Sequence, residues 1–261
     1  MTHVHRREPD TPLHFWGSSL NVRVALELPT MKRAVIALLL LCAACAGQVG
    51  APMKASEVPQ RKEILRNHRV TASLLELAPG EATPMHQHDR DMITVFVNGG
   101  RTQNTLFGQK PTADHMAVGE VRFRHAGLVH AIKNEGAKPF RAVTVEFEDP
   151  QGKLQRKGTA SQSCEGGSKA CVHEKYLFCT VKVCVEDVNM APGAVSTRHS
   201  HPTDHMLIAV SDYALSDKAE GRDTILRKHK SGEVEYLPAG ITHQLTNTSN
   251  AYAHFIVIIW R

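Results

Sequence analysis

Short apolar runs separated by turn-forming residues recur along most of this chain. Val, Ile, Leu and Phe are concentrated in stretches such as residues 93–97, 140–147 and 255–260, which Gly, Pro or Asn bound. Runs of this length with such boundaries are typical of β-strands. No long stretch has the 3.6-residue periodicity of an amphipathic helix. The pattern therefore predicts an all-β protein.

The pattern occurs twice. Each position of the first copy is separated from its match in the second by the same number of residues, the separation between Ala78 and Ala191, which is here called the repeat offset. Ala78-Pro79-Gly80 recurs as Ala191-Pro192-Gly193, and no insertion or deletion interrupts the register from residue 78 to residue 134. The other matched pairs include His86 and His199, His88 and His201, Asp91 and Asp204, Gly119 and Gly232, His130 and His243, and Asn134 and Asn247. One offset shared by turns, strands and histidines indicates a duplicated unit. We predict domains at residues 63–150 and 174–261, a lead-in at 47–62 and a linker at 151–173.

Histidines occupy alternate positions in each copy. Side chains of a strand alternate between its two faces, so residues two apart point the same way. His86, His88 and Met92 share one parity, as do His199, His201 and His205; His130 and His243 follow on another predicted strand. Neutral imidazoles converging inside a barrel are costly to bury unless their ring nitrogens find partners. A divalent ion satisfies several of them at once.

This spacing resembles the two sequence motifs of the cupin superfamily. The first copy reads Gly80-x5-His86-x-His88-x3-Met92-x6-Gly99 and then Gly119-x5-His125-x-Gly127-x2-His130-x3-Asn134. The second reads Gly193-x5-His199-x-His201-x3-His205 and then Gly232-x5-Pro238-x-Gly240-x2-His243-x3-Asn247. The resemblance covers both domains and implies a bicupin: two tandem barrels of the double-stranded β-helix or jelly-roll type, each with a metal site.

The departures from the cupin pattern concern the ligand set. Cupins usually have a glutamate where this chain has Met92 and His205. The second copy thus offers four histidines and the first three, with Met92 a weak thioether at best, so the ligand count favours the second copy. Because the carboxylate is missing, the expected cofactor is a divalent transition metal such as Fe, Zn, Ni or Cu rather than Mn. Three-histidine sites occur among cupin dioxygenases, so the resemblance still permits such an activity.

Asp91 and Asp204 each stand one residue before the glutamate position. Strict alternation points them away from the interior, as structural carboxylates or supports for the ligands, whereas a β-bulge would turn them inward. His125 replaces the turn proline of the second copy and is expected in a loop. The five histidines without a matched partner are expected to be ordinary surface or core residues: His68, His115, His173, His229 and His254.

Residues 31–46, MKRAVIALLLLCAACA, have the pattern of a secretory signal peptide. Lys32 and Arg33 precede an apolar core, and Ala44-Cys45-Ala46 forms a small-x-small cleavage site. The apolar run is shorter than the roughly 20 residues that span a bilayer. Since signal peptides normally begin a chain, we expect Met31 to be the true start and residues 1–30 to come from a misplaced start codon. The expected location is the periplasm or the medium, with no membrane attachment after cleavage.

Export changes how the remaining cysteines are interpreted. Cys164, Cys171, Cys179 and Cys184 lie beyond the signal peptide, and an even number in an oxidising compartment predicts one or two disulfides. Cys164 and Cys171 flank the segment EGGSKA, so a local loop closure between them is the favoured pairing. A zinc site is the alternative, although the spacing is not that of a Cys-x2-Cys zinc knuckle.

Charge and composition narrow the function without naming a substrate. The formal net charge is +5 with no dense basic run, which argues against nucleic acid as a partner. Three functions remain for a small-molecule ligand: a dioxygenase-type oxidoreductase, a Zn or Ni Lewis-acid isomerase or lyase, and a non-catalytic protein that binds a small ligand or the metal. A chain with two copies can pair its barrels internally, so a monomer or a homodimer is expected.

Overall fold

In a computed structural model, the chain is described for residues 51–164 and 170–261. The proposed start at Met31, the signal peptide at 31–46 and the beginning of the lead-in lie outside these residues. Strands account for nearly all regular structure in the described part, which contains one short 3-10 helix, η1 (Ala55–Glu57). None of its helices is long and apolar enough to cross a membrane. The all-β prediction is confirmed.

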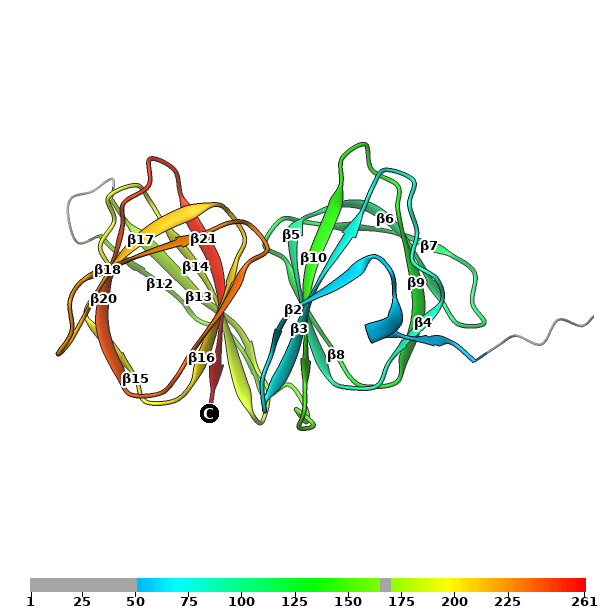
Figure 1. The fold of residues 1–261 in the computed structure, drawn as a ribbon, viewed down its shortest axis with the longest axis horizontal. Helices are drawn as coiled ribbons and strands as arrows, with labels where there is room; N and C mark the ends of the chain where they lie inside the picture. Colours follow the sequence, from blue (N-terminus) through cyan, green and yellow to red (C-terminus); the bar gives the residue numbers. More distant parts are fainter. Residues whose placement is uncertain (1–50, 165–169) are drawn as a thin grey trace, which may run out of the picture. The chain divides into compact units, whose positions relative to one another are not determined.

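Ten strands form the first barrel, and Figure 1 shows them wrapped around an interior. One sheet has the order β1-β4-β9-β6-β7 and the other the order β2-β3-β10-β5-β8. The strands are β1 (Met53–Lys54), β2 (Arg61–Arg66), β3 (Val70–Leu77), β4 (His86–His88), β5 (Met92–Asn98), β6 (Gly100–Leu106), β7 (Thr112–Met116), β8 (Val121–Arg124), β9 (Leu128–Asn134) and β10 (Phe140–Phe147). The predicted lead-in thus supplies β1, which pairs with β4, and the start of β2.

The second barrel repeats this plan. Its larger sheet has the order β11-β13-β14-β21-β16-β19, with β12 paired to β13, and its smaller sheet has the order β15-β20-β17-β18. The strands are β11 (Arg156–Lys157), β12 (Ala160–Ser163), β13 (Val172–Cys179), β14 (Val183–Met190), β15 (His199–His201), β16 (His205–Ala209), β17 (Tyr213–Ala219), β18 (Ile225–His229), β19 (Val234–Leu237), β20 (Ile241–Asn247) and β21 (Ala253–Trp260).

The repeat offset extends to the strands themselves. From β3 and β14 through β10 and β21, equivalent strands begin and end at positions separated by this same offset, except that β16 ends two residues earlier than β5 predicts. The register seen in the sequence from residue 78 to 134 therefore holds from residue 70 to 147. Two tandem barrels are confirmed.

Equivalent positions of the two barrels form one shared apolar core. Each member of this core has its counterpart, one repeat offset away, in the same cluster: Val70 and Val183, Ala72 and Val185, Ile93 and Met206, Val95 and Ile208, Val97 and Val210, Val143 and Ile256, Val145 and Ile258, Phe147 and Trp260. These side chains are nearly all fully buried. Because apolar area removed from water is the main source of stability, the two barrels stabilise each other.

Close packing across this core is symmetric as well. A Cβ placed on Gly119 would lie 2.3 Å from the ring of His254, and one placed on Gly232 would lie 2.9 Å from the guanidinium of Arg141. Arg141 and His254 are themselves equivalent positions. Polar contacts also join the barrels, since Arg69 Nε donates to Asp204 Oδ2 at 2.9 Å. The two barrels of one chain therefore pack against each other, as the duplication suggested.

The segment at 151–173, expected to be a linker, also carries strands. β11 and β12 both pair with β13, which itself begins at Val172. The sequence of β12 is polar and mostly exposed, as expected for a strand at the edge of a sheet, which backbone hydrogen bonds hold. The pattern of hydrophobic residues therefore did not reveal them.

Two disulfide bonds are present among the described residues. Cys164 is bonded to Cys171, the pair that loop closure favoured. Cys179 is bonded to Cys184 across the β13–β14 turn, where the two residues face each other in the ladder. Disulfides persist in oxidising compartments, so both bonds are consistent with a location outside the cytoplasm.

Candidate metal centres

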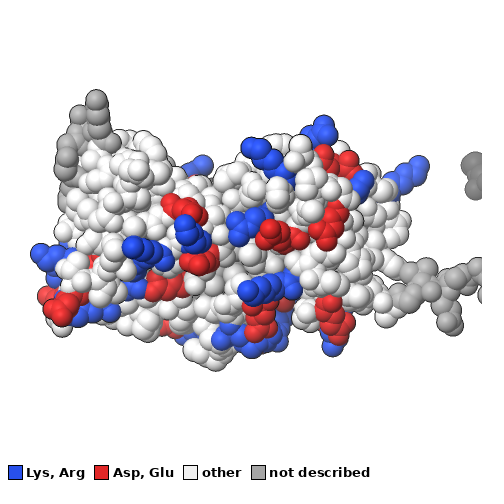
Figure 2. Space-filling model, turned by 45° about the horizontal axis from the view of Figure 1, so that its top comes forward, with Lys and Arg blue, Asp and Glu red and all other residues white. Residues whose placement is uncertain are grey.

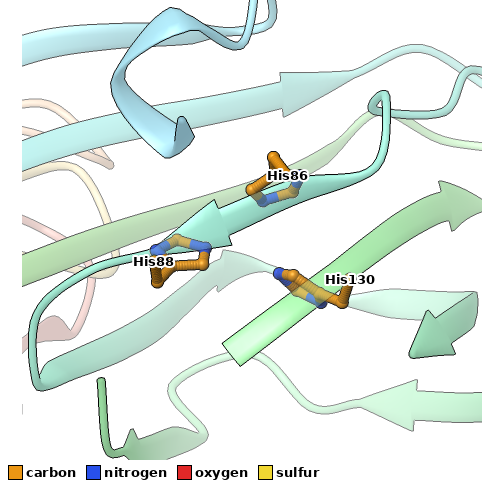
Figure 3. Close-up of side chains that lie close together, drawn as sticks. All are labelled: His86, His88 and His130. Carbon is orange, nitrogen blue, oxygen red and sulfur yellow. The ribbon is translucent and has the colours of Figure 1, made fainter. Parts of the chain in front are cut away.

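The three histidines of the first barrel converge inside it. His86 and His88 lie on β4, and His130 lies on the neighbouring strand β9 directly opposite His86. Their ring centroids are 4.6 to 5.4 Å apart, and Figure 3 shows the rings gathered on one side of the two strands. His86 and His88 are completely buried. Alternation along β4 therefore places both rings in the interior, as predicted.

Each of these rings is oriented by an acceptor at its outer nitrogen. The Nδ1 atom of His86 donates to the Pro84 carbonyl at 2.9 Å. Those of His88 and His130 donate to Glu146 Oε1 at 2.7 Å and to Asn104 Oδ1 at 2.9 Å. A histidine that donates from Nδ1 keeps its lone pair on Nε2.

The inner nitrogens fit a metal ion. One ligand atom from each of the three histidines lies within 4.8 Å of the others. The Nε2 atoms of His86 and His130 are buried without a hydrogen-bond partner. Metal-ligating histidines characteristically donate their other ring nitrogen to a carboxylate or carbonyl in this way. A divalent ion at this point satisfies the buried lone pairs.

Burial keeps the imidazoles neutral. It lowers the pKa of His86 to about 4 and, together with the neighbouring rings of His86 and His88, that of His130 to about 2. It also lowers the pKa of His88. Because a metal ligand must be deprotonated, protons compete little for this site near neutral pH.

A cavity of about 250 Å³ adjoins His88 and His130. Its wall is largely apolar and includes Met92, which is buried and shares the inward face of the histidines. Arg61, Arg122 and Arg124 also line it. Arg122 is held by the carboxylates of Asp114 and Glu120. The cavity is therefore small, mostly apolar and positively charged.

Arg61 is the cavity residue that sequence reasoning missed. Its guanidinium donates from Nη1 to Ser73 Oγ at 3.2 Å, and Nη2 lies 3.4 Å from His88 Nε2. Its Nε atom is buried without a partner. Burial lowers the pKa of Arg61 to about 10, which still leaves it a cation at neutral pH. A buried guanidinium without a carboxylate in hydrogen-bond contact can still bind an anion.

The second barrel brings together His199, His201 and His243. His199 faces His243 in the β15–β20 ladder, and their Nε2 atoms are 3.2 Å apart. His199 Nδ1 donates to the Thr197 carbonyl at 2.9 Å. One ligand atom from each of the three histidines again lies within 4.8 Å of the others. His199 and His201 are only partly buried, unlike their counterparts.

His205, expected as a fourth ligand, lies outside this group. Its ring stacks on His201, with centroids 3.8 Å apart and planes 14° from parallel. It is almost fully buried, and neither ring nitrogen makes a well-formed hydrogen bond. Strand parity turned His205 inward, as predicted. Because its ring is nearly parallel to that of His201, the in-plane lone pairs of the two rings do not converge on one metal position. The second set has three convergent histidines, so the advantage expected from ligand count disappears.

Asn104 and Asp217 hold equivalent histidines in the two barrels. Asp217 Oδ1 accepts from His243 Nδ1 at 2.8 Å, as Asn104 accepts from His130. The two residues occupy matched positions of β6 and β17. The sequence could have indicated this role, because both copies have a polar residue at this matched position.

Asp91 and Asp204 bind backbone amides and nearby side chains rather than the convergent histidines, and Nδ1 of the loop residue His125 lies 3.3 Å from Asp91 Oδ1. Asp91 accepts from the backbone amides of Ala126 at 2.9 Å and Gln151 at 2.7 Å. Asp204 accepts from Ala239 N at 2.9 Å and from the Tyr236 hydroxyl at 2.7 Å. Both carboxylates therefore fix the turn that precedes the second histidine strand, as strict alternation predicted, and no bulge turns them inward.

The cavity of the second barrel is larger, about 550 Å³, and contains two carboxylates that the sequence did not single out. Glu174 and Glu186 line it together with His199, His201 and His205. Burial, and then the charge of Glu174, raise the pKa of Glu186 to about 7. Glu186 therefore carries a proton over part of the neutral range.

Replacing Glu186 with glutamine is expected to stabilise the protein at high pH. The folded protein holds this proton up to about pH 7, whereas the unfolded chain releases it near pH 4.5, so wild-type stability falls as pH rises between these values. The Glu186→Gln variant lacks this loss. We expect its unfolding free energy, relative to wild type, to rise by about 2 kcal/mol from pH 4.5 to pH 8, allowing for partial solvent screening. Chemical denaturation across this range measures it; a constant difference would contradict the assignment.

Two closed β-barrels in one chain, each with histidines converging from a pair of adjacent strands, define the cupin fold in its two-barrel form. The structure is similar to AerE from Microcystis aeruginosa, with a TM-score of 0.53 at 15% identity, over 78% of this chain and 98% of that one. It is also similar to oxalate decarboxylase OxdC from Bacillus subtilis, with a TM-score of 0.53 at 13% identity, over 82% of this chain and 78% of that one. These similarities establish the fold. No protein-family model matches the sequence, and no curated protein matches it either.

Proposed function

We propose that this chain is an exported, metal-dependent oxidoreductase of the dioxygenase type, whose first barrel acts on a small organic molecule that carries a carboxylate. The observation that supports it most is the convergence of ring nitrogens from His86, His88 and His130, beside a small cavity lined by Arg61. The two disulfides, together with the signal-peptide pattern, support export.

The ligand set favours particular metals. Three neutral imidazoles without a carboxylate suit Fe, Ni, Cu or Zn better than Mn, although Mn(II) centres are named for the oxalate decarboxylase of similar fold. A redox-active ion bound by three histidines supplies open coordination positions and the electron transfer that dioxygen chemistry needs. The protein's own groups then have to bind, orient and shield the substrate.

The cavity residues divide these tasks between them. Arg61 can receive a substrate carboxylate within reach of the histidine cluster, and the apolar wall, which includes Phe96, Ile132 and Phe140, excludes water. Glu146 holds the His88 ring; the favourable charge interactions with His88 and Arg61 outweigh its burial, and its pKa is lowered. Glu146 therefore stays ionised as an orienting group.

The available carboxylates argue against a Lewis-acid isomerase or lyase. Such an enzyme needs a proton acceptor at the cavity, and the acidic residue that lines it among the described residues is Asp114, which Arg122 holds in an ion pair. The hydrogen bond to Arg122, the largest of several effects, lowers the pKa of Asp114. Tyr213 lines neither histidine cavity.

The face shown in Figure 2 has no single basic patch of the kind that binds nucleic acid. On this face, Lys and Arg lie beside Asp and Glu. A small-molecule ligand in the cavity remains the proposed partner.

Metal analysis followed by oxygen consumption tests the proposal. Protein purified without affinity metals is reconstituted with Fe(II), Ni(II), Cu(II) or Zn(II), and oxygen uptake is measured with catechol and with 3,4-dihydroxybenzoate, which differ by one carboxylate, alongside diketones and flavonols. We expect uptake with a redox-active ion and a preference for the carboxylate member of the pair. Turnover without oxygen, or with Zn(II) alone, would favour the Lewis-acid alternative. Tight binding without chemistry would leave a binding protein.

A further inference from the structure

The two cavities carry opposite charges at equivalent positions. Arg61 and Ser73 of the first barrel correspond, at the repeat offset, to Glu174 and Glu186 of the second. The strand registers agree, since Arg61 faces Leu75 and Glu174 faces Val188, which is the equivalent of Leu75. In the first barrel the pair is a guanidinium that lines the cavity and is bonded to the hydroxyl of Ser73. In the second it is two carboxylates.

Glu174 and Glu186 lie on the same face of adjacent strands. Glu186 faces Tyr176 in the ladder, two positions along β13 from Glu174. Such diagonal neighbours have Cβ atoms several ångströms apart, roughly 7 Å, within reach of long side chains. Glu174 accepts a hydrogen bond from Ser161 at 3.3 Å, whereas the Glu186 carboxylate has no hydrogen-bond or ion-pair partner within the described residues. Among the described residues, the groups that shift the pKa of Glu186 include no basic side chain.

A second feature of this cavity is a buried histidine, which interacts with the backbone of Thr203. The ring of His205 lines it and is 1% exposed, and neither ring nitrogen makes a well-formed hydrogen bond. Buried polar groups are normally hydrogen-bonded, and the exceptions call for an explanation. The remaining wall is mostly apolar and aromatic, with Leu207, Phe255, Val257 and Trp260 among its members. Arg261 also lines the cavity, but its Nη1 donates to Gln155 Oε1 at 2.6 Å and to the Thr180 carbonyl at 3.1 Å rather than to either carboxylate. The cavity thus offers two carboxylates without a basic partner in contact among the described residues, a buried imidazole and an apolar wall.

We infer that the second barrel is a binding site for a small organic cation, a primary ammonium on an apolar stem, whose charge lies between Glu174 and Glu186. An ammonium has three donors, which suits two carboxylates. An inorganic cation suits the place less well, because within the described residues no third ligand atom joins the two carboxylates in a metal-binding group. Ion sites of Ca²⁺ need six to eight oxygen ligands. The inference does not depend on any activity of the first barrel.

A bound ammonium would lower the pKa of Glu186. Burial and the neighbouring carboxylate of Glu174 favour its protonated form. A bound ammonium reverses the local field and favours the ionised form, as an opposite charge at close range does. The two barrels then share a fold and a histidine set but select ligands of opposite charge.

Calorimetric titration of the full chain with hexylamine, hexanoate and hexanol tests the inference. The three probes share an alkyl stem and carry a positive, a negative and no charge at pH 7.5. We expect hexylammonium to bind more tightly than hexanol. Glu186→Gln and Glu174→Gln are each expected to weaken its binding at least tenfold. Glu220→Gln, which removes an exposed carboxylate of the same barrel, is the matched control and should have no effect.

A variant that exchanges the charge of the cavity distinguishes a specific effect on ligand charge from general damage to the site. The double variant Glu174→Arg/Glu186→Ser places the equivalent residues of the first barrel in the second, and we expect it to lose hexylammonium binding and gain binding of hexanoate. Thermal unfolding establishes that each variant is folded. Hexylammonium binding that none of these variants changes would overturn the inference. So would stoichiometric Mg²⁺ or Ca²⁺ binding that displaces hexylammonium and is lost in both glutamine variants, because the site would then belong to an inorganic cation.

Discussion

Replacing His130 with alanine is expected to remove metal from the first barrel. The ring supplies one of three inward nitrogens, and its Nε2 atom is buried without a protein partner. With two histidines left, we expect the metal affinity of this barrel to fall by more than about 100-fold, since loss of an outer hydrogen-bond partner alone costs 10- to 100-fold. Metal content per chain, measured after dialysis against a chelator, should fall by one equivalent or close to it.

Two further variants separate a lost ligand from a damaged barrel. Asn104→Ala keeps all three histidines but removes the acceptor that orients His130, so we expect a weaker effect, about 10- to 100-fold. His243→Ala removes the equivalent ring from the second barrel and should leave the metal of the first in place. If His130→Ala retained full metal content, the convergent histidines would not be the site. If all three variants lost metal in proportion to their loss of thermal stability, the effect would be structural.

Replacing Arg61 with glutamine is expected to abolish the preference for carboxylate substrates. The guanidinium lies beside His88, and its Nε atom is buried without a hydrogen-bond partner among the described residues. Hydrogen bonds to a charged group contribute about 1.5–3 kcal/mol, so the affinity for 3,4-dihydroxybenzoate should fall by roughly 10- to 150-fold. The affinity for catechol should change little. Equilibrium binding, or KM for each member of the pair, measures the difference.

The Arg61→Gln variant is expected to lose substrate affinity without losing folding stability. Arg61 is a buried cation whose desolvation is only partly offset, by Ser73 and the more distant charge of Glu146. Removing a buried charge that lacks a close partner costs little or stabilises, so the ligand-free Arg61→Gln variant should unfold within about 1 kcal/mol of wild type or above it. Arg66→Gln, which removes an exposed arginine paired with Glu63, is the matched control. Equal weakening of catechol and 3,4-dihydroxybenzoate would show that Arg61 only shapes the cavity.

Whether the position of a candidate residue could be predicted depends on whether neighbouring residues in the sequence or distant parts of the fold set that position. Side-chain parity along β4 and β15 depends only on the strand, so the inward direction of His86, His88, His199 and His201 could be predicted from spacing. The constant repeat offset likewise predicted that one copy would repeat the strands of the other. Parity also turned His205 inward, but it does not set the angle of a ring, and contact with His201 decided that angle.

Arg61 and Glu174 show the limit of sequence reasoning most clearly. Both lie in segments with little apolar alternation: Arg61 in the lead-in and Glu174 at the start of the second domain. Each is well separated along the chain from the first convergent histidine of its copy, His86 or His199. Nothing local connects them to the sites. They reach the cavities because β2 and β13 pair with β3 and β14.

The amino-acid sequence by itself determined the strand pattern, the duplication and the face on which the histidines lie, because these depend on a period of two and on a repeat that the chain itself contains. Tertiary structure alone decided which distant side chains complete each cavity and what charge each cavity carries. It also decided that eight pairs of equivalent apolar residues form one core. The physical reason is that strand pairing joins residues whose separation along the chain is not encoded in any local period.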